Sequence, residues 1–214
     1  MTTQRIDTSQ GPAEVVVHRA EEESGVVVLT HGAGGDVDSV DLTALAEALP
    51  TAGHTVMLVR MPWRVAGKKL APRPAVIDQC YTEVLAGLDL TGPVVLGGRS
   101  AGARSACRLA AASGAGGVLA LSFPLHPPGK PERSRLDELT GAEVPTLVVQ
   151  GERDPFGRPE EYPADLAADL VVVPAADHSL KVPKRADITA DEVAALVVEA
   201  TLEWLVGLPG NDGG

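Results

Sequence analysis

Three residues of the types that carry out nucleophilic catalysis follow one another at wide intervals in the chain, namely Ser100, Asp154 and His178. A serine hydroxyl is a weak nucleophile at neutral pH and needs a general base. A neutral imidazole can take the hydroxyl proton and later give it to the leaving group. A carboxylate can fix the imidazole tautomer and stabilise the imidazolium. These residue types therefore predict acyl transfer by a serine–histidine–aspartate triad.

Ser100 lies at the centre of Gly98-x-Ser100-x-Gly102, between an apolar run at 94–96 and a helix-favouring stretch at 101–112. The pattern is typical of a strand–turn–helix elbow, in which very small residues let the strand and the helix pass closely. Such a turn raises the serine hydroxyl above the sheet, at the positive end of the helix. Taken alone, the pentapeptide also fits a glycine-rich turn with an incidental serine.

The acid and the base each follow an apolar run, 146–150 before Asp154 and 170–173 before His178. The order serine, acid, histidine is that of triads built at the ends of parallel strands. Alternatively, Asp154 forms a turn before a proline and His178 is an ordinary surface histidine. Asp177 is the less favoured acid, because chain neighbours rarely face each other.

The backbone is expected to supply the fourth part of the chemistry, an oxyanion hole that stabilises the charge on the attacked carbonyl oxygen. We expect the N–H groups of Ala101, directly after the serine, and of Ala33, in a glycine loop after an early strand. Gly34 is the next candidate in that loop. His31, which opens the loop, is interpreted as its support rather than as a second base.

Several further residues near the expected strand ends are candidate substrate contacts: Gly34, Arg99, Arg64, Lys68, His126 and Phe156. Arg64 and Lys68 belong to a basic loop at 60–74 in an otherwise acidic chain. The loop and Arg99 could recognise an anionic group, although a solvated loop is the favoured interpretation. For His126 a structural role is favoured.

The positioning elements are expected to be short apolar strands that alternate with helices. Strands are predicted at 14–18, 25–30, 55–59, 94–96, 118–122, 144–150 and 170–173. Helices are predicted at 38–49, 75–90, 101–112, 135–139, 160–168 and 189–205, the last with Thr189 and Glu192 as a capping box. This alternation predicts an α/β fold, a three-layer α/β/α sandwich with a mostly parallel twisted sheet. Sites in such sheets form at the carboxyl ends of the strands.

The organisation expected is a single domain at 13–207, with a loose N-terminal arm at 1–12 and a frayed tail at 208–214. The connection at 123–143 is too short for a helical cap. We therefore predict no lid domain and an open, shallow site suited to small or exposed acyl groups.

Composition limits the partners of this chain of 214 residues, whose formal net charge is −11. That charge argues against nucleic acid and anionic membranes, and no apolar run approaches the roughly 20 residues of a membrane span. The polar first ten residues lack a signal core, which favours a cytoplasmic location with Cys80 and Cys107 as reduced core thiols. Histidine spacing predicts no metal, and Ala103 replaces the lysine of a phosphate loop. We expect no cofactor, a small-molecule acyl substrate, and an oligomeric state that the sequence leaves open.

Five segments together resemble the α/β-hydrolase superfamily over nearly the whole chain: 31–35, 98–102, 123–131, 149–157 and 177–181. The chain has some likeness to dienelactone hydrolases. It more closely resembles a small branch that includes a testis-expressed protein and a non-catalytic subunit of a histone acetyltransferase complex. The resemblance implies this fold and a triad of Ser100, Asp154 and His178, and it implies no particular substrate.

The favoured hypothesis is a serine hydrolase of esterase or thioesterase type that works through an acyl-serine. The competing hypothesis is a catalytically silent interaction module of the same fold, which would not need the complete set of residues. A third is the same triad acting on amides or on a carbon–carbon bond.

Overall fold

A computed structural model of the chain describes residues 1–209. Its centre is one eight-stranded sheet with the order β1-β2-β4-β3-β5-β6-β7-β8. The strands are β1 (Thr2–Thr8), β2 (Gly11–His18), β3 (Gly25–Thr30), β4 (His54–Arg60), β5 (Val94–Arg99), β6 (Gly117–Leu121), β7 (Thr146–Gly151) and β8 (Asp169–Val173). The ladders from β4 through β8 are parallel, whereas β1 and β2 add an antiparallel edge.

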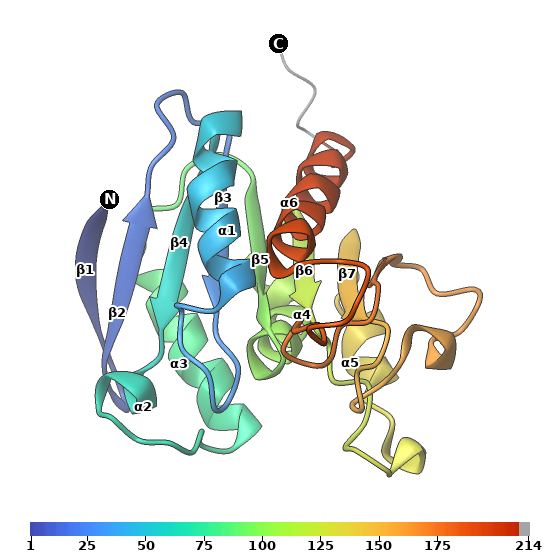
Figure 1. The fold of residues 1–214 in the computed structure, drawn as a ribbon. Helices are drawn as coiled ribbons and strands as arrows, with labels where there is room; N and C mark the ends of the chain where they lie inside the picture. Colours follow the sequence, from blue (N-terminus) through green and yellow to red (C-terminus); the bar gives the residue numbers. More distant parts are fainter. Residues whose placement is uncertain (210–214) are drawn as a thin grey trace.

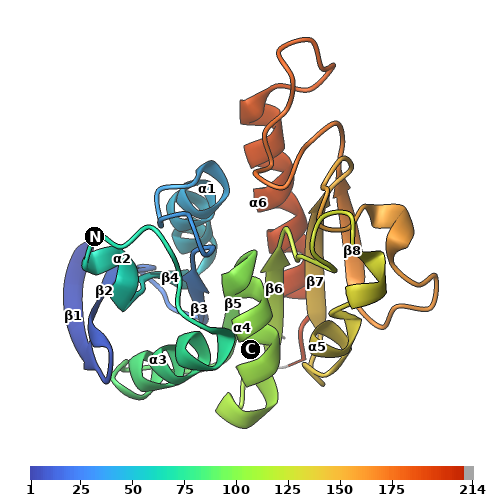
Figure 2. The same cartoon turned by 90° about the horizontal axis from the view of Figure 1, so that it is seen from below.

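Helices cover both faces of this sheet, as Figures 1 and 2 show. One face carries α1 (Val40–Ala48) and α6 (Ala190–Val206), and the other carries α3 (Pro74–Ala86), α4 (Ala101–Ser113) and α5 (Leu136–Thr140). Shorter elements are α2 (Pro62–Val65) and the 3-10 turns η1 (Leu49–Ala52), η2 (Pro131–Arg133) and η3 (Pro159–Glu161). The predicted α/β/α sandwich with a mostly parallel sheet is confirmed.

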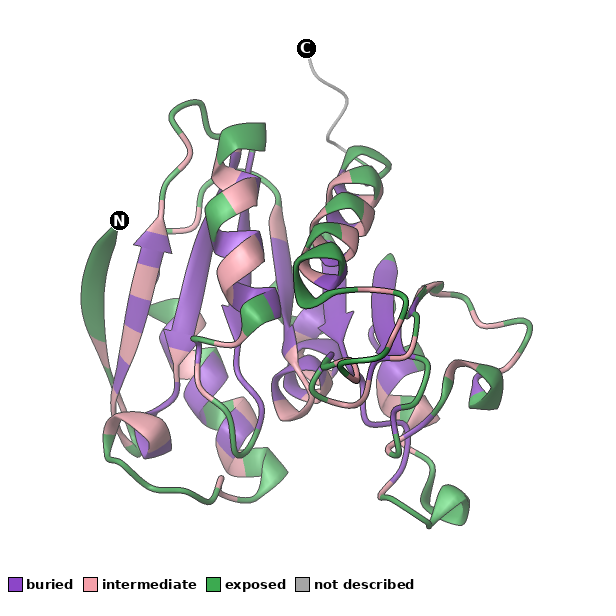
Figure 3. Ribbon diagram, in the orientation of Figure 1, coloured by how far each residue is buried: buried purple, intermediate pink, exposed green. Residues whose placement is uncertain are grey.

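The central strands are buried on both sides because helices lie above and below them (Figure 3). Their continuous runs of Val, Leu and Ala match what a doubly covered parallel sheet requires. The expected capping box also forms, since the Thr189 side chain accepts the N–H of Glu192 and the Glu192 carboxylate accepts the N–H of Thr189. The segment between β6 and β7 holds only η2 and α5, so residues 1–209 contain no lid domain.

The N-terminal segment differs from the expectation of a loose arm at 1–12. Residues 2–8 form β1, which pairs antiparallel with β2 in a hairpin closed by Gly11 at φ 107°. The strand is polar and mostly exposed, so its own residues carry little apolar signal, and pairing with β2 is what orders it.

Three smaller differences concern local elements. Residues 62–65 form the short α2 inside the stretch that was expected to be a loop. Of the helix predicted at 160–168, only 160–161 is helical, as part of the 3-10 turn η3, because the segment has prolines at both 159 and 163. In the predicted tail, Leu208 is buried in the core, and 210–214 lie outside the described residues.

Candidate functional site

The turn between β5 and α4 holds Ser100 in a backbone conformation that few side chains adopt, with φ 52° and ψ −108°. Its N–H donates to the carbonyl of Leu121 on β6, at 2.9 Å. A Cβ on Gly102 would lie 2.7 Å from the carbonyl oxygen of Thr30, and one on Gly98 would overlap that same oxygen. Glycine is therefore required at both positions for β5 and α4 to pass β3 this closely, and this packing holds the strained serine in place.

A chain of hydrogen bonds joins the serine to a histidine and an aspartate. Nε2 of His178 lies 2.9 Å from Oγ of Ser100, and Nδ1 lies 2.7 Å from Oδ2 of Asp154. An ionised carboxylate only accepts hydrogen bonds, so Nδ1 carries the proton and Nε2 accepts from the serine hydroxyl. This is the tautomer that a general base needs.

The aspartate is fully buried and its orientation is set by two further donors. Nε2 of Gln150, near the end of β7, donates to Oδ2 at 2.9 Å and also to the Gly157 carbonyl. The N–H of Phe156 donates to Oδ1 at 2.8 Å. Three donors therefore fix one carboxylate, which compensates its loss of water.

The histidine is held by a ring contact and stays open to solvent on one side. The Phe156 ring stacks on the imidazole with centroids 4.1 Å apart. The His178 side chain is 20% exposed, Ser100 is partly exposed, and Ala33 and Gly34 are exposed. A reacting group can therefore approach the serine from solvent.

The glycine loop after β3 lies against the serine, because a Cβ on Gly32 would be 3.3 Å from Cβ of Ser100. The N–H of Met61 donates to Nε2 of His31, so Nδ1 carries the proton and donates to the Gly32 carbonyl at 2.8 Å. Burial lowers the pKa of His31, which favours this neutral form. His31 thus supports the loop next to Ala33.

The opposite side of the nucleophile is the first turn of α4, which begins at Ala101. The first N–H groups of a helix have no partner within the helix. The Ala101 N–H, directly after the serine, is one of these groups and lies at the positive end of α4.

Two arginines of the basic loop form ion pairs with carboxylates of the chain itself. Arg60 and Arg64 both pair with Asp36, at 2.7 and 3.6 Å, and Arg60 also pairs with Glu14 at 3.2 Å, so both guanidinium groups have carboxylate partners within the chain. The Lys68 side chain is exposed. Among residues 1–209, no hydrogen bond, ion pair or ring contact joins the side chain of Arg64 or Lys68 to the serine, histidine and aspartate.

His126 lies beside the aspartate loop rather than beside the serine. Its N–H donates to the carbonyl of Phe156, and its ring contacts the Pro127 carbonyl and the Glu161 carboxylate, both at 2.9 Å. Burial acts to lower the pKa of His126, but these two acceptors outweigh it and raise the pKa. The residue ties the 123–131 segment to the aspartate loop.

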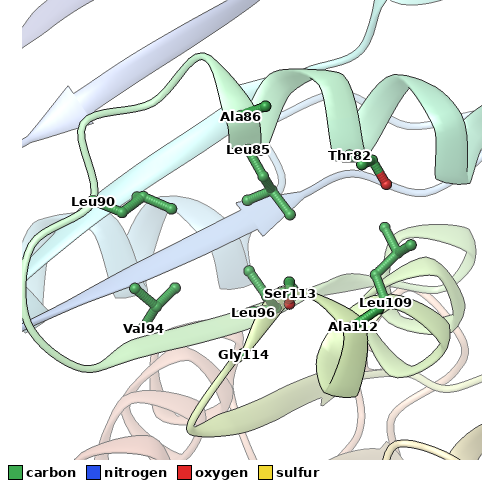
Figure 4. A pocket seen from close by; sticks show the side chains of 10 residues that line it. All are labelled: Thr82, Leu85, Ala86, Leu90, Val94, Leu96, Leu109, Ala112, Ser113 and Gly114. Carbon is green, nitrogen blue, oxygen red and sulfur yellow. The ribbon is translucent and has the colours of Figure 1, made fainter.

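An apolar pocket of about 450 Å³ lies away from this site, between α3 and α4 (Figure 4). Its lining includes Leu85 and Leu90 together with Val94 at the amino end of β5 and Gly114 after α4. The serine lies at the other end of both β5 and α4. The pocket therefore does not belong to the hydrogen-bonded site.

Two absences hold for the part of the chain that the structure describes. No group of three or more His, Cys, Asp or Glu side chains is arranged to hold a metal ion. None of its helices is both long and apolar enough to cross a membrane.

Sequence reasoning overlooked two residues that take part in this arrangement. Gln150 directly follows the apolar residues 147–149 of β7 and is buried with them, and a long polar side chain at that position was a usable signal. Asp41 in the first turn of α1 is 3% exposed and pairs with Arg99. A first-turn acid is common in helices, so the sequence contained no comparable signal for it.

A mostly parallel sheet covered on both faces, with a serine on a strained strand–helix turn and its partners after later strands, defines an α/β-hydrolase fold. The chain belongs to the family described as "Alpha/beta hydrolase domain", whose model matches residues 23–206.

Solved structures show the same fold at low sequence identity. A serine hydrolase homologue from Coxiella burnetii is 19% identical with a TM-score of 0.72, covering 93% of this chain and 96% of that one. A serine hydrolase without a lid from Xanthomonas campestris is 22% identical with a TM-score of 0.70, covering 97% and 95%. A dienelactone hydrolase from Anabaena variabilis is 18% identical with a TM-score of 0.71, covering 97% of each chain.

Proposed function

We propose that this protein is a serine hydrolase of esterase or thioesterase type, with Ser100 as nucleophile, His178 as general base and acid, and Asp154 as the orienting acid. The observation that carries the proposal is the continuous hydrogen-bond chain from the buried Asp154 carboxylate through the His178 ring to the Ser100 hydroxyl. If these hydrogen bonds had only a structural role, they would not require a strained backbone at Ser100.

The chemistry begins when Oγ of Ser100 attacks the acyl carbon and its proton passes to Nε2 of His178. The carbonyl electrons move to oxygen, and we assign the N–H groups of Ala33 and Ala101 to stabilise that charge. Collapse breaks the bond to the leaving group, which takes the proton from His178 and leaves an acyl-serine. Water then gives a proton to His178 and attacks the acyl carbon, and Ser100 departs with that proton.

The substrate class follows from the open surroundings of the serine. Ala33 and Gly34 are exposed, and the described part of the chain contains no lid domain. Both observations support small or exposed acyl groups as substrates. Phe156, beside His178, is the candidate contact for the acyl or leaving group. A small-molecule acyl substrate belongs to the same proposal, as does membership of the branch with the testis-expressed protein, which rests on the sequence motifs. A cytoplasmic location is also proposed, and the free, buried thiols of Cys80 and Cys107 support it.

The test is labelling by a fluorophosphonate probe, which captures an activated serine. We expect stoichiometric labelling of wild type, none for Ser100→Ala or His178→Ala, and full labelling for Ser179→Ala, a matched exposed serine next to the histidine. A folded wild-type protein that is not labelled would overturn the proposal and favour a non-catalytic interaction module. Labelled protein would then be screened with matched esters, thioesters and amides.

A further inference from the structure

We propose that Arg99 is a positioning residue, which holds His178 at the correct position relative to Ser100, the residue that directly follows Arg99 in the chain. This inference rests on the proposed function. Nε of Arg99 donates to Oδ2 of Asp41 at 2.9 Å, and Nη2 donates to the main-chain carbonyl of His178 at 2.7 Å. The sequence had placed Arg99 among the candidate substrate contacts. Its observed partners point to a different role.

The histidine needs an anchor because of where its loop lies. It follows β8, the outermost strand of the sheet, so there is no further strand to hold it. The loop has positive φ at Ala175 and Leu180, and the Asp177 carboxylate accepts two N–H groups within it. Before the histidine, Arg153 donates its N–H to the Ala176 carbonyl. These hydrogen bonds set the shape of the loop and connect its beginning to Arg153, the neighbour of Asp154.

Arg99 supplies the link from this loop to the serine. It is the last residue of β5 and directly precedes Ser100, so its main chain moves with the nucleophile. Its bond to the His178 carbonyl therefore joins the two residues whose side chains must meet at 2.9 Å. A displacement of about 1 Å between reacting groups can cost about 10²-fold in rate.

Asp41 sets the direction of the guanidinium. The Arg99 side chain is 14% exposed and the Asp41 side chain 3% exposed, so the pair is largely shielded from water. A guanidinium is a planar fork and can donate to two partners in different directions at once. A lysine would retain the charge beside Asp41, but a single ammonium at the end of a flexible chain does not reproduce both bonds.

The competing role, recognition of an anionic substrate, makes a different prediction. A recognition residue changes KM for anionic substrates alone. A positioning residue lowers kcat equally for neutral and anionic substrates and leaves KM unchanged, since it acts only on the alignment of the reacting groups.

The experiment compares Arg99→Lys and Asp41→Asn with Arg104→Lys as the matched control. Arg104, in the first turn of α4, also donates through Nε and Nη2, in its case to the carboxylate of Glu138 on α5. Within residues 1–209 its side chain has no hydrogen bond to the histidine loop. Folding of each variant is checked by urea unfolding, and kcat and KM are measured on a neutral ester and on its carboxylate-bearing analogue.

We expect about 10²-fold lower kcat for Arg99→Lys on both esters, with KM unchanged, a similar loss for Asp41→Asn, and activity near wild type for Arg104→Lys. The proposal is overturned if Arg99→Lys behaves like Arg104→Lys, or if its defect is a higher KM for the anionic ester alone. Amide hydrogen exchange of residues 174–181 is the second readout and should speed up in Arg99→Lys and in Asp41→Asn but not in Arg104→Lys. Because hydrogen exchange can be measured without enzymatic activity, it still tests whether Arg99 holds the histidine loop if the wild-type protein is inactive and the proposed function fails.

Discussion

Replacing Asp154 with asparagine changes a side chain that only accepts hydrogen bonds into one that must donate. Oδ2 faces two donors, Nδ1 of His178 at 2.7 Å and Nε2 of Gln150 at 2.9 Å, and Oδ1 faces the N–H of Phe156 at 2.8 Å. If the amide nitrogen takes the Oδ1 position, it opposes the Phe156 N–H. If it takes the Oδ2 position, its N–H groups face the N–H donor of Gln150, and the histidine must accept at Nδ1, which is the wrong tautomer for a general base.

The magnitude of the effect follows from these two orientations. Either one leaves at least one buried donor without an acceptor, which costs about 1–3 kcal/mol of unfolding free energy. In either one the imidazolium loses its carboxylate. In a triad of this kind the substitution lowers kcat by about 10⁴-fold, which is about 5 kcal/mol of barrier height at 1.36 kcal/mol per tenfold.

The assay is the observed rate constant for fluorophosphonate labelling, measured beside urea unfolding. Asp177→Asn is the matched control, because it makes the same chemical change at the residue next to His178. Asp177 is partly exposed, and among the described residues its Oδ1 accepts only from the loop N–H groups of Ser179 and Lys181. We expect Asp177→Asn to retain most of the wild-type rate constant.

Two results would refute this reasoning. One is that Asp154→Asn keeps more than about a tenth of the wild-type labelling rate constant, which would mean that the barrier height rises by less than about 1.4 kcal/mol. The other is that Asp177→Asn slows labelling as much as Asp154→Asn, which would assign the acid to the wrong residue.

Two further predictions concern the packing around the site. Gly98→Ala should lose about 2–6 kcal/mol of unfolding free energy, because it adds backbone strain at φ 152° and overlap with the Thr30 carbonyl. The control Gly114→Ala adds strain at φ 70° but meets open space, so it should lose only the contribution of the strain. Equal urea midpoints for the two variants would contradict this prediction. His126 has a raised folded pKa, so its stabilisation is complete below the unfolded pKa of about 6.5 and is lost as pH rises through the folded pKa. The difference in urea midpoint between wild type and His126→Gln should therefore shrink over that window, and a difference independent of pH would argue against the contact with Glu161.

The sequence by itself contained the fold class and the residue types of the site. Continuous apolar runs such as 25–30 and 146–150 predicted buried parallel strands, because a doubly covered strand exposes no polar face. The glycines around Ser100 marked a turn that larger residues cannot form. Both signals are local, and each depends only on residues within a few positions.

Only the tertiary structure decided how distant residues are paired. Polar β1 is a strand because β2 lies beside it, and no local pattern records that pairing. Gln150 and Asp41 orient Asp154 and Arg99 through single hydrogen bonds whose partners are set by folding. The Arg99 guanidinium joins Asp41 to the main-chain carbonyl of His178, 79 residues away, and any amino acid at 178 would present the same carbonyl oxygen. A contact to a main-chain atom far away in the sequence does not require a particular amino acid at that position. Such contacts therefore cannot be predicted from residue types, and folding alone determines them.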